Sequence, residues 1–253
     1  MTLTLDLHSH SGYSGGVGQI SLEAVAKAMI LKGIDVFGTG DALHLAWHQH
    51  LKDVLVEKNP GLYQLPAFPK RYFILQTEII ASFPFQKKRK SFHLVLLFPN
   101  HLSVEKTRDL LEIWQVKNTI GRPFLVCSSL KELSDRLFQI QEVHPFIEII
   151  PAHVLTPQGA LGSKNPVDSL YEAFGDFTPH IRMIETGLSA DPPILEMIPE
   201  LQNLTYISNS DTHSADLRRI GREFTVVKPK ELTYFSILES LRANEIIYTG
   251  EFS

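Results

Sequence analysis

The sequence predicts an α/β protein built on parallel strands, either as a closed barrel or as an open sheet. Apolar, β-branched runs alternate with helical patterns along the whole chain, giving about eight strands. With 253 residues, 43% of them hydrophobic and 21% charged, the chain can bury a substantial core. The sequence contains no Gly/Ser linker and no internal repeat, so residues 1–253 are expected to form one domain.

Local signals place each element. Residues 3–7 form the first apolar strand, and Ser21 is a helix cap for residues 22–32, where Gly33 ends the helix. Residues 34–37 form the second strand. Further strands are expected at residues 72–79, 94–98, 124–126, 147–150, 181–184 and 205–207. Further helices are expected at residues 104–117, 130–141, 167–174 and 232–242.

Histidine is unusually frequent, with eleven residues against a single cysteine, Cys127. One cysteine excludes an internal disulfide and a cysteine-based zinc ribbon. The net charge of −4 is too small to attract a nucleic acid to the whole surface, so such a partner would need local basic patches. The N-terminus has no signal-peptide pattern, and the longest apolar run, residues 94–98, is too short to span a membrane. We therefore expect a cytoplasmic protein without a membrane partner.

Histidines and carboxylates gather at the ends of the predicted strands. Because residues i and i+2 of a strand point to the same face, His8 with His10, and Asp211 with His213, can act as pairs. Imidazole and carboxylate groups together suit zinc, manganese or iron, and a glutamate among histidines can bridge two ions. The strand-end residues are Asp6, His8, His10, Asp41, Glu78, His93, His153, Glu185, Asp211 and His213.

Each of these residues also has an ordinary structural interpretation. His93 alone would be read as a core histidine, and Glu78 alone as a buried salt-bridge partner. Their shared position at strand ends favours a ligand role instead. A second histidine pair, His48 and His50, lies in a helical pattern without a carboxylate cluster, so we expect it on a solvated helix surface.

The motifs DLHSH, GTGD, TEI, FHLVLLFP, PAH and SNSDTH, in that order, resemble the PHP (polymerase and histidinol phosphatase) superfamily of metal-dependent phosphoesterases. In more detail, GTGDALHLAWHQHL, PAHVLTPQGA, IETGLSAD, SNSDTHS and RRIGREF resemble the PHP domain of the endonuclease Q family, which nicks DNA beside deaminated bases. The resemblance implies a distorted (βα)7 barrel with two or three divalent ions at the C-terminal ends of the strands. Zinc, manganese and iron are the expected metals, with magnesium as an alternative.

The resemblance also implies a ligand set. A first ion would be held by His8, His10, Glu78 and Asp211. A second ion would share Glu78 and bind His93 and His153. Asp41 and His213 would complete a third position. Many PHP phosphatases add a histidine there, but Gly16 occupies the corresponding place in this chain.

Hydrolysis of a phosphate ester fits these residues, because paired cations activate water and neutralise phosphate charge. Asp211 and His213 are candidates to orient that water or to protonate the leaving group. Glu185 is a candidate to fix a ligand imidazole, and a structural ion pair with an arginine is the alternative.

Substrate binding needs cations besides the metals. Arg218, Arg219 and Arg222 follow the last strand-end pair and could contact phosphate, or could form a solvated basic turn. A second basic run lies between Glu78 and His93, as a basic lip for DNA or as a solvated loop: Lys87, Lys88, Arg89 and Lys90. Trp47 could stack on a base or pack in the protein.

The sequence therefore predicts a metal-dependent phosphoesterase, of the endonuclease Q type, that acts on DNA phosphodiesters beside deaminated or damaged bases. A small-molecule phosphatase of the histidinol-phosphate phosphatase type is the main alternative, and a non-catalytic PHP module that binds DNA or protein is another. The sequence lacks the cysteines of the zinc element that follows the PHP domain in endonuclease Q. We therefore expect the active-site chemistry to transfer, whereas recognition of deaminated bases does not follow from these residues.

Overall fold

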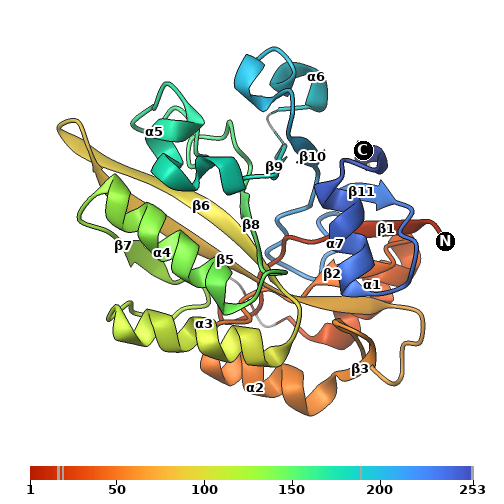
Figure 1. Ribbon diagram of the computed structural model, residues 1–253. Helices are drawn as coiled ribbons and strands as arrows, with labels where there is room; N and C mark the ends of the chain where they lie inside the picture. The colour runs from red at the N-terminus through yellow and green to blue at the C-terminus, as the bar shows by residue number, and fades with distance from the viewer. Residues whose placement is uncertain (16–17, 19, 189, 252–253) are drawn as a thin grey trace.

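A mixed β-sheet forms the centre of the protein, with helices packed around it (Figure 1). The computed structural model describes residues 1–15, 18, 20–188 and 190–251. The main sheet runs in the order β12-β11-β1-β2-β5-β4-β3, with β6 and β7 paired to β5 and β8 paired to β6. A separate parallel pair is formed by β9 and β10.

The strands and helices have the following bounds. The strands are β1 Leu3–Asp6, β2 Val36–Gly38, β3 Val56–Asn59, β4 Leu62–Gln64, β5 Tyr72–Phe85, β6 Lys88–Phe98, β7 Phe124–Val126, β8 Glu148–Pro151, β9 Met183–Glu185, β10 Thr205–Ile207, β11 Glu223–Val227 and β12 Ile246–Glu251. The α-helices are α1 Leu22–Lys32, α2 Leu45–Val54, α3 His101–Ile113, α4 Leu130–Val143, α5 Leu170–Phe174, α6 Pro192–Leu195 and α7 Tyr234–Arg242, and the 3-10 helices are Gly175–His180 and Pro199–Leu201.

The α/β fold class is confirmed, whereas the closed (βα)7 barrel is not. Parallel ladders join β1 to β2 and β2 to β5, but β6 is antiparallel to both β5 and β8. In the described part of the chain no ladder joins β8 to β9, and only one bridge, Ser9 to Thr212, links the end of β1 to the segment after β10. The sheet therefore stays open on the β9–β10 side.

Local sequence signals set the first helix as predicted. The Ser21 side chain accepts a hydrogen bond from the Ala24 amide, and Gly33 ends α1 with φ 70°, a left-handed conformation that costs glycine little. The buried face of α1 includes Val25 and Met29. Helices α3 and α4 cover the sheet on the β5–β6 side, and α7 packs near β11 (Figure 1).

The largest departures from the predicted elements lie in antiparallel pairs. The strand expected at residues 72–79 continues to Phe85 and returns directly as β6, forming one long hairpin. Strands β11 and β12, which pair antiparallel at one edge of the sheet, were not predicted. Both departures are antiparallel strand pairs. The prediction rested on strands that alternate with helices, and this pattern does not indicate two strands that follow one another directly.

None of the helices within the described ranges has the length and hydropathy of a membrane span. Gly16, where the resemblance expects a departure from PHP phosphatases, lies outside the described residues.

Candidate metal centre

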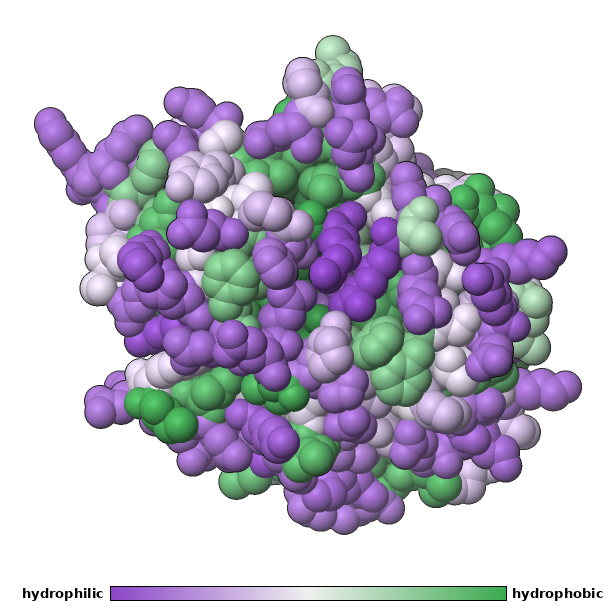
Figure 2. Space-filling view, viewed as in Figure 1, coloured by the Kyte–Doolittle hydropathy of each residue, from purple (hydrophilic) through white to green (hydrophobic). Residues whose placement is uncertain are grey.

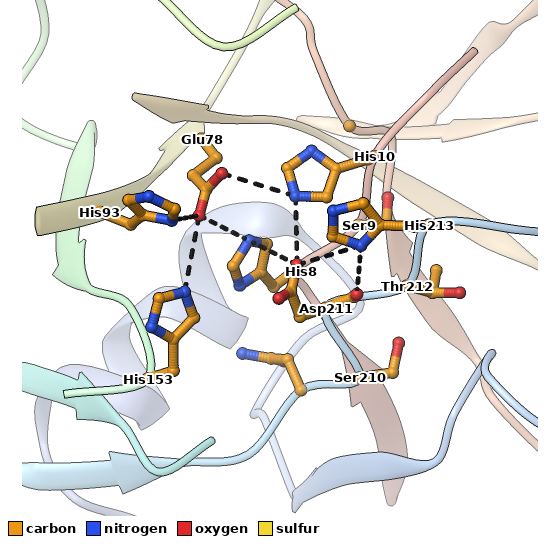
Figure 3. Close-up of polar contacts among 12 residues, drawn as sticks. His8, Ser9, His10, Glu78, His93, His153, Ser210, Asp211, Thr212 and His213 are labelled. Carbon is orange, nitrogen blue, oxygen red and sulfur yellow. Dashed lines mark hydrogen bonds and ion pairs between the residues drawn. The ribbon is translucent and has the colours of Figure 1, made fainter. Parts of the chain in front are cut away.

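Two groups of three side chains can each hold a metal ion, and they lie next to each other (Figure 3). The ligand atoms within each group are all within 4.8 Å of one another. The first group is His8, His10 and Asp211, and the second is Glu78, His93 and His153. The groups meet where Glu78 Oε1 lies 3.6 Å from His8 Nε2 and Glu78 Oε2 lies 3.5 Å from His10 Nε2.

Strand geometry brings these side chains together. His8 and His10 lie on the segment after β1, on either side of the Ser9 bridge to Thr212, which places Asp211 beside them. On the β5–β6 hairpin, His93 pairs with Ile80, and Glu78 lies two residues before Ile80 on the same face. His153 follows β8. His8, His10, His153 and Asp211 thus lie just past strands, as predicted, whereas Glu78 and His93 lie in the middle of β5 and β6, because these two strands are longer than predicted.

His8 is oriented by a carboxylate that faces its other ring nitrogen. Both carboxylate oxygens of Glu185 lie 3.0 Å from His8 Nδ1. Glu185 also accepts hydrogen bonds from the His153 amide at 2.9 Å and from Asn209 Nδ2 at 2.9 Å. A proton on Nδ1 leaves the Nε2 lone pair directed at Glu78 and Asp211, so Glu185 acts on His8 as a carboxylate that fixes a ligand imidazole. This contact is the one that the predicted role of Glu185 requires, and among the described residues no arginine forms an ion pair with it; the role itself stays a prediction.

Two further imidazoles, those of His153 and His10, also have polar groups beside Nδ1. The Thr156 hydroxyl donates to the His153 carbonyl at 2.9 Å and lies 2.7 Å from His153 Nδ1, so Nδ1–H donates to Thr156 and Nε2 faces Glu78. His10 Nδ1 faces Ser14 Oγ at 3.3 Å and Asp41 Oδ1 at 3.5 Å. Its Nε2 lies 3.1 Å from Asp211 Oδ1.

The donor set fits divalent cations. His8 Nε2 and both carboxylate oxygens of Glu78 are buried and lack a hydrogen bond among the described residues. They nevertheless face one another, with imidazole nitrogens from 2.6 Å to 3.7 Å from the Glu78 oxygens. Buried lone pairs that converge in this way are stabilised by a cation, and nitrogen and oxygen donors without thiolate suit zinc, manganese or iron.

Electrostatics point to the same need for positive charge. Burial opposes the charged forms, but hydrogen bonds with Asp211 and Asp41 raise the pKa of His10 to about 9. The pKa of Glu78 is held well below its usual range by the surrounding imidazoles, again against burial. Carboxylates in the cluster therefore favour any cation beside them, a proton or a metal ion.

Three of the predicted residues have an unusual backbone conformation. Asp41, His153 and Asp211 have φ values of 45°, 31° and 46°. Non-glycine residues rarely adopt positive φ, and such strain is concentrated at functional sites. A Cβ on Gly121 would lie 2.2 Å from Asp41 Cγ, so only glycine allows the Asp41 carboxylate to occupy its place.

Asp41 and His213 contact the first group without joining either three-residue set. Asp41 Oδ2 accepts hydrogen bonds from the Ser11 amide at 2.7 Å and the Ser11 hydroxyl at 2.5 Å, and its other oxygen faces His10. The His213 ring lies 4.2 Å from the His10 ring, and its Nδ1 donates to the Asp211 carbonyl at 2.9 Å. The third ion position stays a prediction.

Two residues of the site were missed from the sequence. Arg122 Nη1 lies 3.5 Å from Glu78 Oε2, which places a guanidinium directly beside the second ligand group. Gln76 Oε1 accepts the amides of Gly40 at 3.0 Å and Ser9 at 3.3 Å, tying the segments after β1 and β2 together. Arg122 directly follows Gly121, the glycine that packs against Asp41. Neither Arg122 nor Gln76 belongs to a motif in the sequence analysis.

A cavity of about 230 Å³ opens beside the ligands. Its walls include His153, Asp211 and Arg222. Figure 2 shows strongly hydrophilic side chains gathered near the middle of the face that looks toward the viewer. Of the three arginines predicted to bind substrate, Arg222 is the one that lines this cavity. Its guanidinium also donates to the Ser210 carbonyl at 3.3 Å.

The other predicted substrate residues lie further away. Arg218 is exposed and paired with Asp216 at 2.8 Å, and Arg219 lines a separate surface pocket with it. Lys87 and Lys88 are exposed at the tip of the β5–β6 hairpin, five residue pairs beyond His93 and thus about 17 Å along the strands. Lys90 is fully buried, and its Nζ donates to the Gly162 carbonyl at 3.3 Å, so it is not part of an exposed basic lip.

The remaining histidines correct one expectation. His50 is exposed as predicted, but His48 is buried, and its Nε2 lies 2.8 Å from His101 Nδ1 between α2 and α3. Trp47 is also buried and donates from Nε1 to the Gly40 carbonyl at 2.8 Å, in accord with packing rather than stacking on a base.

The fold is shared with known nucleases. The lesion-specific endonuclease from Pyrococcus furiosus superposes on 100% of this chain with a TM-score of 0.84 and 29% sequence identity. An endonuclease Q in complex with a 27-mer duplex carrying an abasic lesion covers 96% of the chain with a TM-score of 0.81 and 31% identity. These likenesses are consistent with a PHP superfamily domain similar to endonuclease Q.

Sequence comparison covers less of the chain. An uncharacterised protein from Methanocaldococcus jannaschii is 38% identical over 88 residues, which are 32% of this chain and 10% of that protein. No family model matches the sequence. The chain spans 60% and 57% of the two endonuclease chains, so it corresponds to less than two thirds of their length.

Proposed function

We propose that this chain is a metal-dependent phosphoesterase that hydrolyses DNA phosphodiester bonds beside deaminated or damaged bases. The observation that carries the proposal is the pair of adjoining ligand groups, joined at Glu78, on a fold shared with a lesion-specific endonuclease along the whole chain. We further propose that residues 1–253 form a single PHP domain, in which the strands around the site are an opened form of the (βα)7 barrel.

The ligand groups define the metal positions of the proposed enzyme. One ion would be held by His8, His10 and Asp211, and the other by Glu78, His93 and His153, with Asp41 and His213 available to a third. Zinc, manganese or iron bound there would supply Lewis-acid chemistry, acidifying water and neutralising charge on phosphoryl oxygens.

The chain's own residues orient the reaction. Glu185 and Thr156 hold the imidazoles of His8 and His153 so that Nε2 faces the centre. Asp211 lies at the centre of the first group and is assigned to orient water. Because His213 Nδ1–H donates to the Asp211 carbonyl, its Nε2 is the atom that we assign to proton exchange with the leaving group.

The cations around the centre match an anionic substrate. Arg222 lines the cavity and is placed to bind a phosphate oxygen through its guanidinium fork. Arg218, Arg219, Lys87 and Lys88 lie further out, where contacts to flanking phosphates of a longer strand would add salt-dependent affinity.

A cleavage assay tests the proposal. Metal-loaded protein is incubated with labelled duplexes that carry uracil, hypoxanthine or an abasic site, with undamaged duplex, and with a panel of phosphomonoesters. We expect nicks beside the lesions and their loss in Asp211→Asn and His8→Ala. Release of phosphate from monoesters with all duplexes intact would identify a small-molecule phosphatase, and activity that survives both substitutions would contradict the metal mechanism.

A further inference from the structure

An exposed aromatic side chain lies beside the metal centre and has no part in the chemistry above. The Tyr13 ring is 43% exposed. It lies 4.5 Å from the His44 ring with 31° between the planes, and 6.0 Å from the Trp47 ring. Because Trp47 is buried and hydrogen-bonded to the backbone after β2, the Tyr13 ring rests on a fixed support.

The backbone ties Tyr13 to the ligands themselves. The Tyr13 amide donates to Ser11 Oγ at 3.1 Å, and the same hydroxyl donates to Asp41. The Tyr13 carbonyl accepts from the Gly121 amide at 2.9 Å, and Gly121 packs against the Asp41 carboxylate. Tyr13, Asp41 and Gly121 therefore form one unit at the edge of the centre.

The same unit presents a cation. Arg122 directly follows Gly121, and Nη1 contacts Glu78 at 3.5 Å. Its side chain is 22% exposed, and Nε lacks a hydrogen-bond partner in the part of the chain that the structure describes. A metal ion on Glu78 would compete for that carboxylate, leaving the guanidinium available for a phosphate oxygen. Ile120, 48% exposed, adds an apolar edge.

This surface and the 230 Å³ cavity lie on two sides of His10. His10 Nε2 faces Asp211, which lines the cavity, whereas Nδ1 faces Asp41, which belongs to the Tyr13 unit. A phosphate at the metal centre thus has a cavity on one side and an aromatic ring with an arginine on the other.

We propose that Tyr13, supported by His44, stacks on a nucleobase next to the bond that is cleaved, while Arg122 binds the adjoining phosphate. The inference rests on the proposed function and deepens it. A contact with a second, adjoining phosphate is one that an internal phosphodiester offers and a simple phosphomonoester does not. Stacking on an exposed ring with a nearby cation is how proteins bind unpaired bases without reading their sequence.

Base stacking is measured by placing 2-aminopurine on either side of an abasic site in a labelled duplex. Binding of metal-loaded protein is followed by anisotropy on duplexes whose linkages beside the abasic site are phosphorothioates, which keep the charge and resist cleavage, and stacking is followed by quenching of 2-aminopurine fluorescence. The variants are Tyr13→Ala, Tyr13→Phe and, as matched control, Tyr171→Ala, which removes a 59% exposed tyrosine on α5.

We expect Tyr13→Ala to weaken binding by about 5- to 30-fold and to abolish quenching at one of the two positions. Tyr13→Phe and Tyr171→Ala should behave as the unmodified protein, because both keep the ring at position 13. If Tyr13→Ala shows the same quenching and the same affinity as the unmodified protein, the inference is overturned. The proposed DNA-nicking function would not be affected by that result. An unmodified protein that neither binds nor nicks DNA would overturn the proposed function itself.

The arginine has its own readout. Arg122→Ala should reduce the slope of log affinity against log salt by about one unit, and Arg122→Lys should restore it, because each phosphate contact releases about one counterion. Equal slopes for Arg122→Ala and the unmodified protein, with folding verified by thermal melting, would remove Arg122 from the site.

Discussion

Two buried histidine clusters in this molecule differ in what surrounds them. At the metal centre His8 and His10 face carboxylates, which raise the pKa of both imidazoles despite burial. Between α2 and α3, His48 faces His101 and the Arg108 guanidinium, and burial together with these groups lowers its pKa to about 4. Burial of histidines alone therefore does not create a site for a cation. Carboxylates that converge on the imidazoles are needed as well.

The largest expected effect follows from the carboxylate that joins the two ligand groups. Glu78→Gln keeps the size of the side chain but removes its charge, so we expect bound metal to fall and phosphodiester hydrolysis to drop by about 10³-fold or more. Metal content is measured by plasma mass spectrometry beside a nicking assay. His48→Gln is the matched control from the other cluster and should retain its metal. Full metal content in Glu78→Gln would contradict the ligand assignment.

A smaller effect is expected from the carboxylate behind His8. Glu185→Gln should weaken metal affinity by about 10- to 100-fold, because the Nδ1 proton of His8 loses its charged acceptor. Competition with a fluorescent chelator measures the affinity. Glu148→Gln changes an equally buried carboxylate, one that pairs with Arg242 at 2.7 Å, and should leave metal affinity unchanged. The account fails here if both variants bind metal equally well.

The α2–α3 cluster predicts a pH effect on stability rather than on metal binding. Since the pKa of His48 is lowered to about 4 from 6.5, the unfolded chain takes up the proton first, and stability is lost as the pH falls from about 6.5 toward 4. In denaturant unfolding at pH 7 and pH 5, the loss of stability on acidification should be smaller in His48→Gln than in the unmodified protein by on the order of 1 kcal/mol. His50→Gln, on the exposed face of the same helix, should keep the loss. An identical pH dependence in His48→Gln would show that the pair is not the cause.

The smallest effect is expected at the hairpin tip. Replacing Lys87 and Lys88 with alanine should lower DNA affinity a few-fold and reduce the salt slope by about two units, if both contact phosphates. Chemistry at the centre, about 17 Å away along the strands, should be unaffected. Binding titrations over a range of salt concentrations measure this. An unchanged slope would make the tip an ordinary solvated turn.

Part of the site was predictable because the apolar runs of β1 and β10 are local signals. The polar residues that follow them, His8 and His10 after β1 and Asp211 and His213 after β10, could be located without any knowledge of the sheet. The bounds of α1 followed from Ser21 and Gly33, whose capping roles are local.

What could not be predicted depends on contacts between distant segments. Arg122 reaches Glu78 through a loop between two elements, and the role of Gly121 depends on Asp41, 80 residues earlier. Lys90 sits in a charged run that reads as solvated, yet the hairpin register buries it. His48 was assigned to a solvated face because its partner His101 lies on another helix.

The central claim is that the two ligand groups that meet at Glu78, and not the His48–His101 pair, bind metal at two adjoining positions. Anomalous diffraction at the edges of zinc, manganese and iron from crystals of metal-loaded protein tests it directly. The account predicts one peak among His8, His10 and Asp211, a second among Glu78, His93 and His153, and none at His48 and His101. Absence of both peaks from the two ligand groups, or a peak between α2 and α3, would contradict it.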